Sequence, residues 1–247
     1  MANDIVLAIV VAVGTVPALA QQGPAAFDVA SVKLSTHPLT KEGYSYSDQK
    51  VVSPGRFQAI NSNVAELVRW AYGLEEYQVV APDWMTGNAI TFDIEARAPG
   101  DTPPAQIRLM LQALLSDRLG LAFHRTQEPQ SSYELLVDKG GPKLQRAAVD
   151  TPRAISFGRG SITTVGTSMA RFAAALAREL HCPVLDRTDL TGIFAVELHY
   201  APPLSMEVSD GPSLVTAVQD LGLRLKSVKA PIEVLHIDHA GKIPKPN

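Results

Sequence analysis

The sequence predicts an α+β protein in which one strand–helix module occurs twice. Two observations lead to this prediction. Short stretches of alternating apolar and polar residues, typical of half-buried strands, recur along the 247-residue chain between stretches with the apolar spacing of a helix. The order strand, helix, strand, strand, helix, strand, strand is then found in both halves. We expect mixed or antiparallel sheets with helices packed on one face, because each half-buried strand needs an apolar cover.

The first half opens with a predicted strand over residues 27–33 and continues with a short strand over 57–60. The polar, turn-rich residues 37–54 between them are interpreted as a loop. Further strands are predicted over 79–80 and over 92–97, where Phe92, Ile94 and Ala96 alternate with charged residues.

Two helices are predicted in the first half. Asn63 and Glu66 have the spacing of a capping box, and Gly73 suits the left-handed position after the last turn. The second helix begins at Pro103-Pro104, since proline is favoured in the first turn. After this helix we expect a β-hairpin made of residues 121–123 and 133–137.

The second half repeats the series. Strands, helices and a loop are expected, in chain order, as follows: strand 162–165, helix 169–180, strand 184–185, strand 194–198, loop 201–212, helix 214–221, strand 223–225 and strand 235–237.

The two halves align with small gaps. Gly55-Arg56-Phe57 matches Gly160-Ser161-Ile162, Leu119-Gly120-Leu121 matches Leu221-Gly222-Leu223, and Pro129 matches Pro231. After a further small deletion, Leu135 and Val137 fall on Leu235 and Ile237. The unchanged order of these matches indicates an internal duplication. Whether the halves share one sheet stays open.

The start of the chain is typical of a secretory leader. Residues 5–13 are almost wholly apolar, and Ala18-Leu19-Ala20 forms a small-x-small cleavage site. We expect an extracytoplasmic protein, periplasmic or secreted, with no transmembrane span after cleavage. The expected organisation is a signal peptide over 1–20, a first repeat over 21–147, a linker over 148–158 and a second repeat over 159–247.

Composition excludes several classes of function. The net charge is −3 and the sequence has no basic stripe, so we expect no nucleic acid partner. The single cysteine, Cys182, cannot form an internal disulfide or a multi-cysteine metal site. There is no G-x-S-x-G nucleophile elbow, no P-loop and no H-E-x-x-H pair. We therefore assign no catalytic, cofactor-binding or metal-ligating residue and expect no cofactor.

A possible interaction surface is the remaining site hypothesis. Trp70 lies off the apolar stripe of its helix, and His199 lies beside Glu197 on the polar face of a strand, where solvated surface is the simpler interpretation. His236 and Asp238 would share one strand face. The candidate surface residues are Trp70, Trp84, Asp186, Arg187, His199, His236, Asp238 and His239.

Eight motifs resemble an uncharacterised soil-bacterial family, abundant in Acidobacteria, that carries the DUF3738 domain. They are FDVASVK (27–33), GRF (55–57), ELVRWAYGL (66–74), LMLQALLSDR (109–118), KGGPKL (139–144), DRTDLTG (186–192), PSL (212–214) and VLHIDH (234–239). The resemblance covers nearly all of the chain after the leader. It implies export, and in some relatives attachment to a BlaR-like membrane metallopeptidase, but it implies no activity.

Three functions are compatible with these features. The leading hypothesis is a non-enzymatic binding module of the cell envelope whose partner is another envelope protein, since strand edges can accept a partner strand. The alternatives are a hydrolase-type enzyme with its site between the halves, formed for instance by His124, Glu197 and His199, and a regulatory domain of a membrane peptidase. The oligomeric state stays open.

Overall fold

A computed structural model describes residues 26–36, 46–148, 150–201 and 211–246. The predicted leader lies outside these residues, as does most of the loop expected over 201–212. No helix in the described ranges is long and apolar enough to cross a membrane.

The predicted α+β class is confirmed, with helices and strands mixed along the chain. The helices are α1 (Val64–Tyr72), the 3-10 turn η1 (Glu76–Gln78), α2 (Asp83–Thr86), α3 (Pro104–Leu119), α4 (Met169–Leu180) and α5 (Leu214–Asp220). The strands are β1 (Val29–Leu34), β2 (Asp48–Ser53), β3 (Arg56–Ser62), β4 (Val79–Val80), β5 (Phe92–Arg97), β6 (Ala122–Val137), β7 (Gln145–Arg146), β8 (Ala154–Gly158), β9 (Ser161–Thr167), β10 (Val184–Asp186), β11 (Phe194–His199) and β12 (Leu223–His239).

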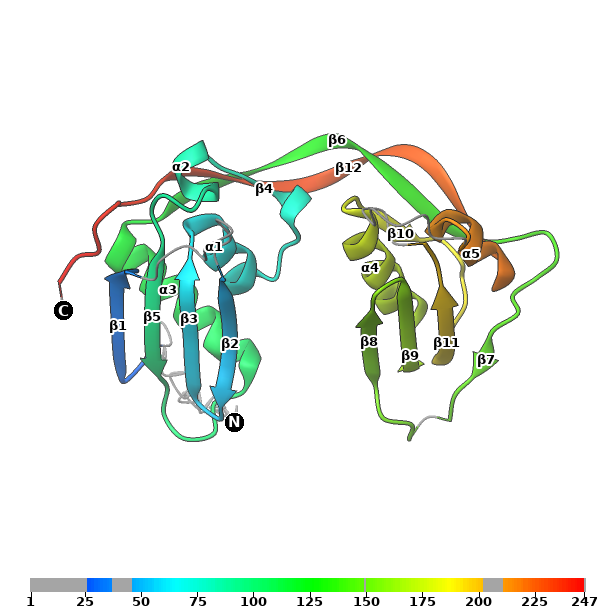
Figure 1. Ribbon diagram of the computed structural model, residues 1–247, viewed down its shortest axis with the longest axis horizontal. Coiled ribbons are helices and arrows are strands. Elements are labelled where there is room, and N and C mark those ends of the chain that lie inside the picture. The colour runs from blue at the N-terminus through cyan, green and yellow to red at the C-terminus, as the bar shows by residue number, and fades with distance from the viewer. Residues whose placement is uncertain (1–25, 37–45, 149, 202–210, 247) are drawn as a thin grey trace, which may run out of the picture.

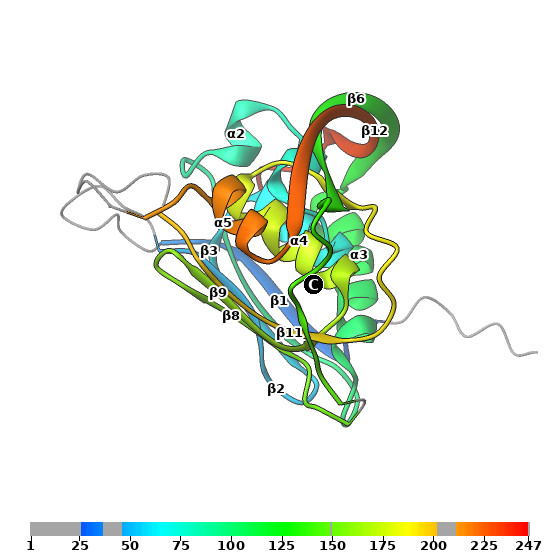
Figure 2. The same cartoon turned by 90° about the vertical axis from the view of Figure 1, so that its right-hand side faces the viewer.

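Three four-stranded sheets organise the described residues into two lobes joined by an arch (Figure 1). The first lobe has the antiparallel order β1-β5-β3-β2, and the second has β7-β11-β9-β8. The third sheet, β10-β6-β12-β4, spans both lobes. It is mixed, because β6 and β12 are antiparallel to each other, whereas β10 runs parallel to β6 and β4 runs parallel to β12. In the turned view the helices α3, α4 and α5 lie between the lobe sheets and this arch (Figure 2).

Helix α1 forms for the local reason that the sequence predicts. The Asn63 side chain accepts a hydrogen bond of 2.9 Å from the Glu66 amide, and the Glu66 carboxylate accepts one of 3.0 Å from the Asn63 amide. Gly73 ends the helix at φ 66°, a backbone conformation that glycine adopts without steric cost. The apolar side of the helix, including Leu67 and Val68, is fully buried against the first sheet.

Two segments differ from the expected loops. Residues 48–53, expected in a loop, form β2 and pair with β3. Residues 154–158, expected in the linker, form β8 and pair with β9. Both are outer strands with several exposed residues, so the alternation of apolar and polar residues that predicts a strand is weak there.

The prediction of a hairpin made of residues 121–123 and 133–137 is wrong. These residues belong to one continuous strand, β6, whose partner over its whole length is β12, from Leu223 opposite Val137 to His239 opposite Ala122. The polar residues around Pro129 suggest a turn, but the chain stays extended because both halves of β6 find apolar cover, one half in each lobe.

Each hydrophobic core is therefore completed by a strand end from the other half of the chain. The first core includes Leu235 and Ile237 of β12, packed with residues of α1, α3 and the first sheet. The second core includes Leu135 of β6, packed with α4 and the second sheet. Leu135 and Leu235 are 0% and 1% exposed, so both lobes depend on this exchange of strand ends.

The ladder between β6 and β12 corrects one detail of the sequence alignment. Tyr133 pairs with Val184 of β10, and Leu235 pairs with Val79 of β4. Tyr133 and Leu235 therefore occupy corresponding places in the two lobes, and they are as far apart in sequence as Pro129 and Pro231. The alignment thus needs no deletion between the prolines and these residues, so Leu235 corresponds to Tyr133 and not to Leu135. The two lobe sheets have the strand orders β1-β5-β3-β2 and β7-β11-β9-β8, and the internal duplication stays a prediction.

Candidate functional site

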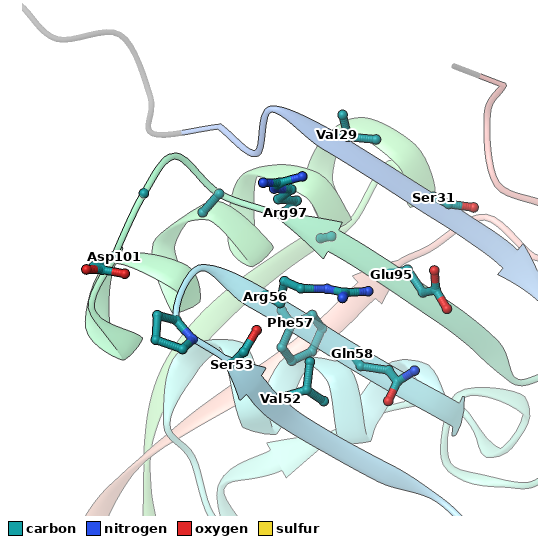
Figure 3. Close-up of a pocket in the computed structure, with 14 residues that line it drawn as sticks. Val29, Ser31, Val52, Ser53, Arg56, Phe57, Gln58, Glu95, Arg97 and Asp101 are labelled. Atoms are coloured by element: carbon teal, nitrogen blue, oxygen red, sulfur yellow. The ribbon is translucent and has the colours of Figure 1, made fainter.

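A hollow of about 750 Å³ lies on the open face of the first sheet, on the side away from α1 and α3 (Figure 3). Strands β1, β5, β3 and β2 contribute its floor, and the turn after Ser53 and the segment 98–101 contribute its rim.

Strand alternation decides which side chains reach this face. On β5, Ile94 and Ala96 are buried toward the helices, whereas Glu95 and Arg97 are exposed on the other side. The register then aligns two rows across the sheet. The rim row is Val29, Arg97, Arg56 and Ser53, and the inner row is Ser31, Glu95, Gln58 and Lys50.

Arg56 and Arg97 are directly opposite each other in the ladder between β3 and β5. Side chains at directly opposed positions start about 4.5–5.5 Å apart, and like charges there repel. Within the described part of the chain, neither guanidinium has an ion-pair or hydrogen-bond partner. The pair therefore presents about ten N–H donors, five from each guanidinium, and two positive charges toward the hollow. An oxyanion bound between them would offset their repulsion through charge-assisted hydrogen bonds.

Two carboxylates limit the positive potential of the hollow. Glu95 lies one row further in, with its side chain on the same face, and Asp101 lies on the rim (Figure 3). The third nearby cation, Lys50, is already paired with Asp48 at 2.5 Å. The arginine pair is thus the strongest anion-binding feature of the hollow, and Glu95 opposes it.

The rim is held by a close backbone approach. The Ala98 amide donates a hydrogen bond of 2.7 Å to the Gly55 carbonyl oxygen. A Cβ atom on Gly55 would lie 2.5 Å from the Gly100 carbonyl oxygen, so a side chain there would displace the segment that walls the hollow. Gly55 also has φ 70°, which favours glycine on conformational grounds.

Among the described residues of the second lobe, no arginine pair lies on the corresponding face. Its strands β9 and β11 occupy the places of β3 and β5, and there Ser161 is opposite His199 and Thr163 is opposite Glu197. His199 forms an exposed pair with Glu197 at 3.0 Å. This neighbouring pair was among the sequence candidates, and the structure places it on solvated surface.

The two tryptophans are partly buried rather than gathered into one patch. Trp70 packs on Phe57 with ring centroids 4.4 Å apart and is covered by Arg108. Trp84 lies under the Lys242 ammonium, 5.3 Å from the ring centroid. Each therefore contributes mainly to packing at the edge of the first core.

Asp186 and Arg187 have structural roles in the turn after β10. The Asp186 carboxylate accepts hydrogen bonds from the amide and hydroxyl of Thr188, at 3.0 and 2.7 Å. The Arg187 amide donates to the Leu135 carbonyl oxygen at 2.9 Å, which extends the pairing of β10 with β6. Such a turn is the ordinary use of an aspartate at this position.

His236 and Asp238 of β12 contact residues of β6 that are distant in the sequence. His236 stacks on His124, with centroids 4.9 Å apart, and bonds the Glu128 carboxylate at 2.6 Å. Asp238 reaches the His124 ring at 2.8 Å, whereas His239 lies exposed at the strand end. Hydrogen bonds from Thr126 and His236 lower the pKa of Glu128. No metal-binding group of three or more ligands is formed by the described residues.

The space between the lobes does not hold the constellation suggested for an enzyme. A small hollow of about 170 Å³ is lined there by Arg69, Glu75, Glu76, Tyr77, Ala177, Arg178 and His181. His124 lies on the arch with Asp238, whereas His199 and Glu197 lie on the second sheet, so the three suggested groups do not converge. Burial, with help from Glu75 and Cys182, raises the pKa of Tyr77 to about 12, which keeps its phenol neutral.

Sequence reasoning missed Arg56 and Arg97. The strand alternation of 92–97 places Arg97 on a polar face, but nothing local indicates that Arg56, 41 positions earlier, is its neighbour. Only the register of β3 against β5 brings the two charges together.

Comparison with protein-family models gives a match. A family model described as "Protein of unknown function (DUF3738)" covers residues 65–240, most of the chain. No curated protein and no solved structure matches the chain.

Proposed function

Because the chain belongs to the DUF3738 family, described only as a protein of unknown function, we propose its function from its geometry. The protein is a non-enzymatic binding module that captures an anionic ligand on the open face of its first sheet. Arg56 and Arg97 bind the oxyanion, and the adjoining Val29, Val52 and Pro54 contact the less polar part of the ligand.

The single observation that carries this proposal is the unpartnered arginine pair. Two guanidinium groups at opposed strand positions destabilise the sheet unless something neutralises them. Within the described residues nothing does, and the pair lines the hollow of about 750 Å³. A carboxylate or a phosphate fits this chemistry, since a guanidinium binds either with two parallel N–H donors.

The envelope is the compartment that we propose for this binding. Support comes from the apolar residues 5–13 followed by Ala18-Leu19-Ala20. Cell fractionation followed by N-terminal sequencing tests it: an exported chain that starts at Gln21 supports the proposal, and a cytoplasmic chain with an intact leader contradicts it.

The binding test uses two anionic probes, hexaglutamate and inorganic phosphate, with hexalysine as the charge-reversed control. Titration calorimetry should show that at least one anion binds the wild-type protein and that hexalysine does not. Hydrogen bonds to charged groups contribute about 1.5–3 kcal/mol each. Loss of one such bond from each arginine costs about 3–6 kcal/mol in all, so the double variant Arg56→Ala, Arg97→Ala should bind the anion about 100- to 10,000-fold more weakly.

A matched control removes the same charge elsewhere. Arg153 and Arg159 are exposed residues of the second lobe, outside the hollow. The double variant Arg153→Ala, Arg159→Ala should keep wild-type affinity. Equal weakening in both double variants would show a non-specific charge effect and overturn the proposed site, as would the failure of both anions to bind.

A further inference from the structure

The outer edge of the second sheet is largely unpaired among the described residues, whereas the corresponding edge of the first sheet is paired with β1. In the first lobe, β1 pairs with β5 at six positions, from Leu34 opposite Phe92 to Val29 opposite Arg97. In the second lobe, β7 takes the place of β1 but pairs with β11 only at Phe194 and Ala195. Within the described residues, the outer edge of β11 from Val196 to His199 has no paired strand.

The orientation of the backbone shows which groups this edge exposes. The Tyr200 amide donates to the Gly160 carbonyl oxygen beside β9, at 2.8 Å. The Ile193 carbonyl oxygen accepts from the Ala147 amide next to β7, at 2.9 Å. Because backbone groups alternate in direction along a strand, Glu197 and His199 direct their N–H and C=O groups to the open edge. In the described part of the chain these four groups have no backbone partner.

The chain that would fill the place turns away just before β7. The Lys143 amide instead donates to the Leu221 carbonyl oxygen at 2.8 Å, and the Asp138 amide donates to the Gly222 carbonyl oxygen at 2.9 Å. These bonds hold the segment 138–143 next to the end of α5. The open edge is therefore built into the fold by specific contacts.

We propose that this edge of β11 binds an extended segment of another polypeptide, which completes the second sheet as β1 completes the first. The segment runs antiparallel to β11 and pairs with four residues, Val196 to His199. Addition of a strand to an exposed edge is a known mode of peptide recognition. The proposal stands apart from the anion site, which lies in the other lobe.

The neighbouring side chains define the chemistry of this segment. Val196 and Leu198 point into the core, so the residues opposite them are small and apolar, as Val32 and Ala30 are opposite Ile94 and Ala96. Glu197 points to the open face and is about 71% exposed. A lysine or arginine opposite Glu197 complements its charge. The occupant is thus a segment of the pattern small apolar, basic, small apolar.

The probe is the acetylated, amidated tetrapeptide Val-Ala-Lys-Val, with Val-Ala-Glu-Val as its charge-reversed control. Amide NMR of the full-length protein should show saturable shifts at Glu197 and His199 with the lysine peptide and at least fivefold weaker binding of the glutamate peptide. The exposed substitution Glu197→Lys should invert this preference. A lysine peptide methylated on its lysine amide nitrogen should not bind, because it lacks the donor that pairs with Glu197.

Two further variants separate this site from the anion site. His199→Pro removes an edge-facing N–H and should abolish peptide binding, whereas His199→Val should preserve it. The double variant Arg56→Ala, Arg97→Ala should bind the lysine peptide like the wild type. No shifts at Glu197 and His199 at millimolar peptide, or an unchanged charge preference in Glu197→Lys, would overturn the proposal.

Discussion

Pro129 lies directly opposite Pro231 in the antiparallel ladder between β6 and β12. On β6, the Tyr133 amide and the Leu135 carbonyl oxygen bond toward β10, so odd-numbered residues of this strand direct their backbone groups away from β12. The two prolines therefore form a non-hydrogen-bonded pair, and neither interrupts the ladder. At this midpoint the described residues supply no third strand to the arch, and a proline leaves no N–H donor there for another chain to pair with.

Replacing both prolines tests this role. The double variant Pro129→Val, Pro231→Val should keep its fold and lose only about 0.4–1 kcal/mol of unfolding free energy per site, because the unfolded chain gains freedom. It should also self-associate, since two edge N–H groups become available. Denaturant titration and light scattering over a concentration series measure both effects. The control Ser131→Val, Lys229→Val adds apolar surface at a neighbouring pair without adding N–H groups; if it associates as strongly, the edge explanation fails.

The exchange of strand ends predicts crossed effects of two core substitutions. Leu235→Ala should cost about 2–5 kcal/mol and should loosen α1 and α3, although Leu235 belongs to the second half of the sequence. Leu135→Ala should loosen α4 instead. Hydrogen exchange resolved by segment measures this. Loosening of α4 by Leu235→Ala, with α1 and α3 unaffected, would contradict the exchanged cores.

Glu128 should titrate below the ordinary glutamate pKa of about 4.3. Hydrogen bonds from Thr126 and His236 stabilise its ionised form in the folded protein. A lowered folded-state pKa means that this stabilisation is present above about pH 4.3 and is lost as the pH falls through the lower value. Carbon-detected NMR of the carboxyl group measures the pKa, and Thr126→Val should raise it. A wild-type value at or above 4.3 would exclude these hydrogen bonds in solution.

Glu95 should weaken anion binding in the wild-type protein. It lies on the same face as Arg56 and Arg97, one row further in. Glu95→Gln removes its charge with little change in shape, so hexaglutamate or phosphate should bind about twofold to fivefold more tightly at low salt, with the gain screened at higher salt. Calorimetry at two salt concentrations measures this. Weaker binding in Glu95→Gln would mean that Glu95 positions the arginines rather than opposing the ligand.

Local chemistry explains which elements could be predicted. The capping box of Asn63 and Glu66 and the alternation from Phe92 to Arg97 depend on neighbours in sequence, and both are found in the structure. The partner of β6 depends on residues about 100 positions away. The polar stretch around Pro129 is equally compatible with a turn, and only β12 decides the outcome.

The same distinction applies to the candidate site. Alternation predicts that Arg97 is exposed on a strand, but the register of β3 decides whether the residue opposite is a carboxylate or a second arginine. Similarly, His236 and Asp238 could be identified as polar strand residues, while their contacts with His124 and Glu128 required the pairing of two distant strands. Charge pairs across a sheet are set by register, and register is set by the core.

The position of a bound anion is the most direct test of the proposed function. Amide and arginine side-chain NMR of the full-length protein should show the largest saturable shifts at Arg56 and Arg97 when hexaglutamate or phosphate is added, with the second sheet unaffected. Shifts confined to residues outside the first sheet, or no saturable shift with either anion, would contradict the account.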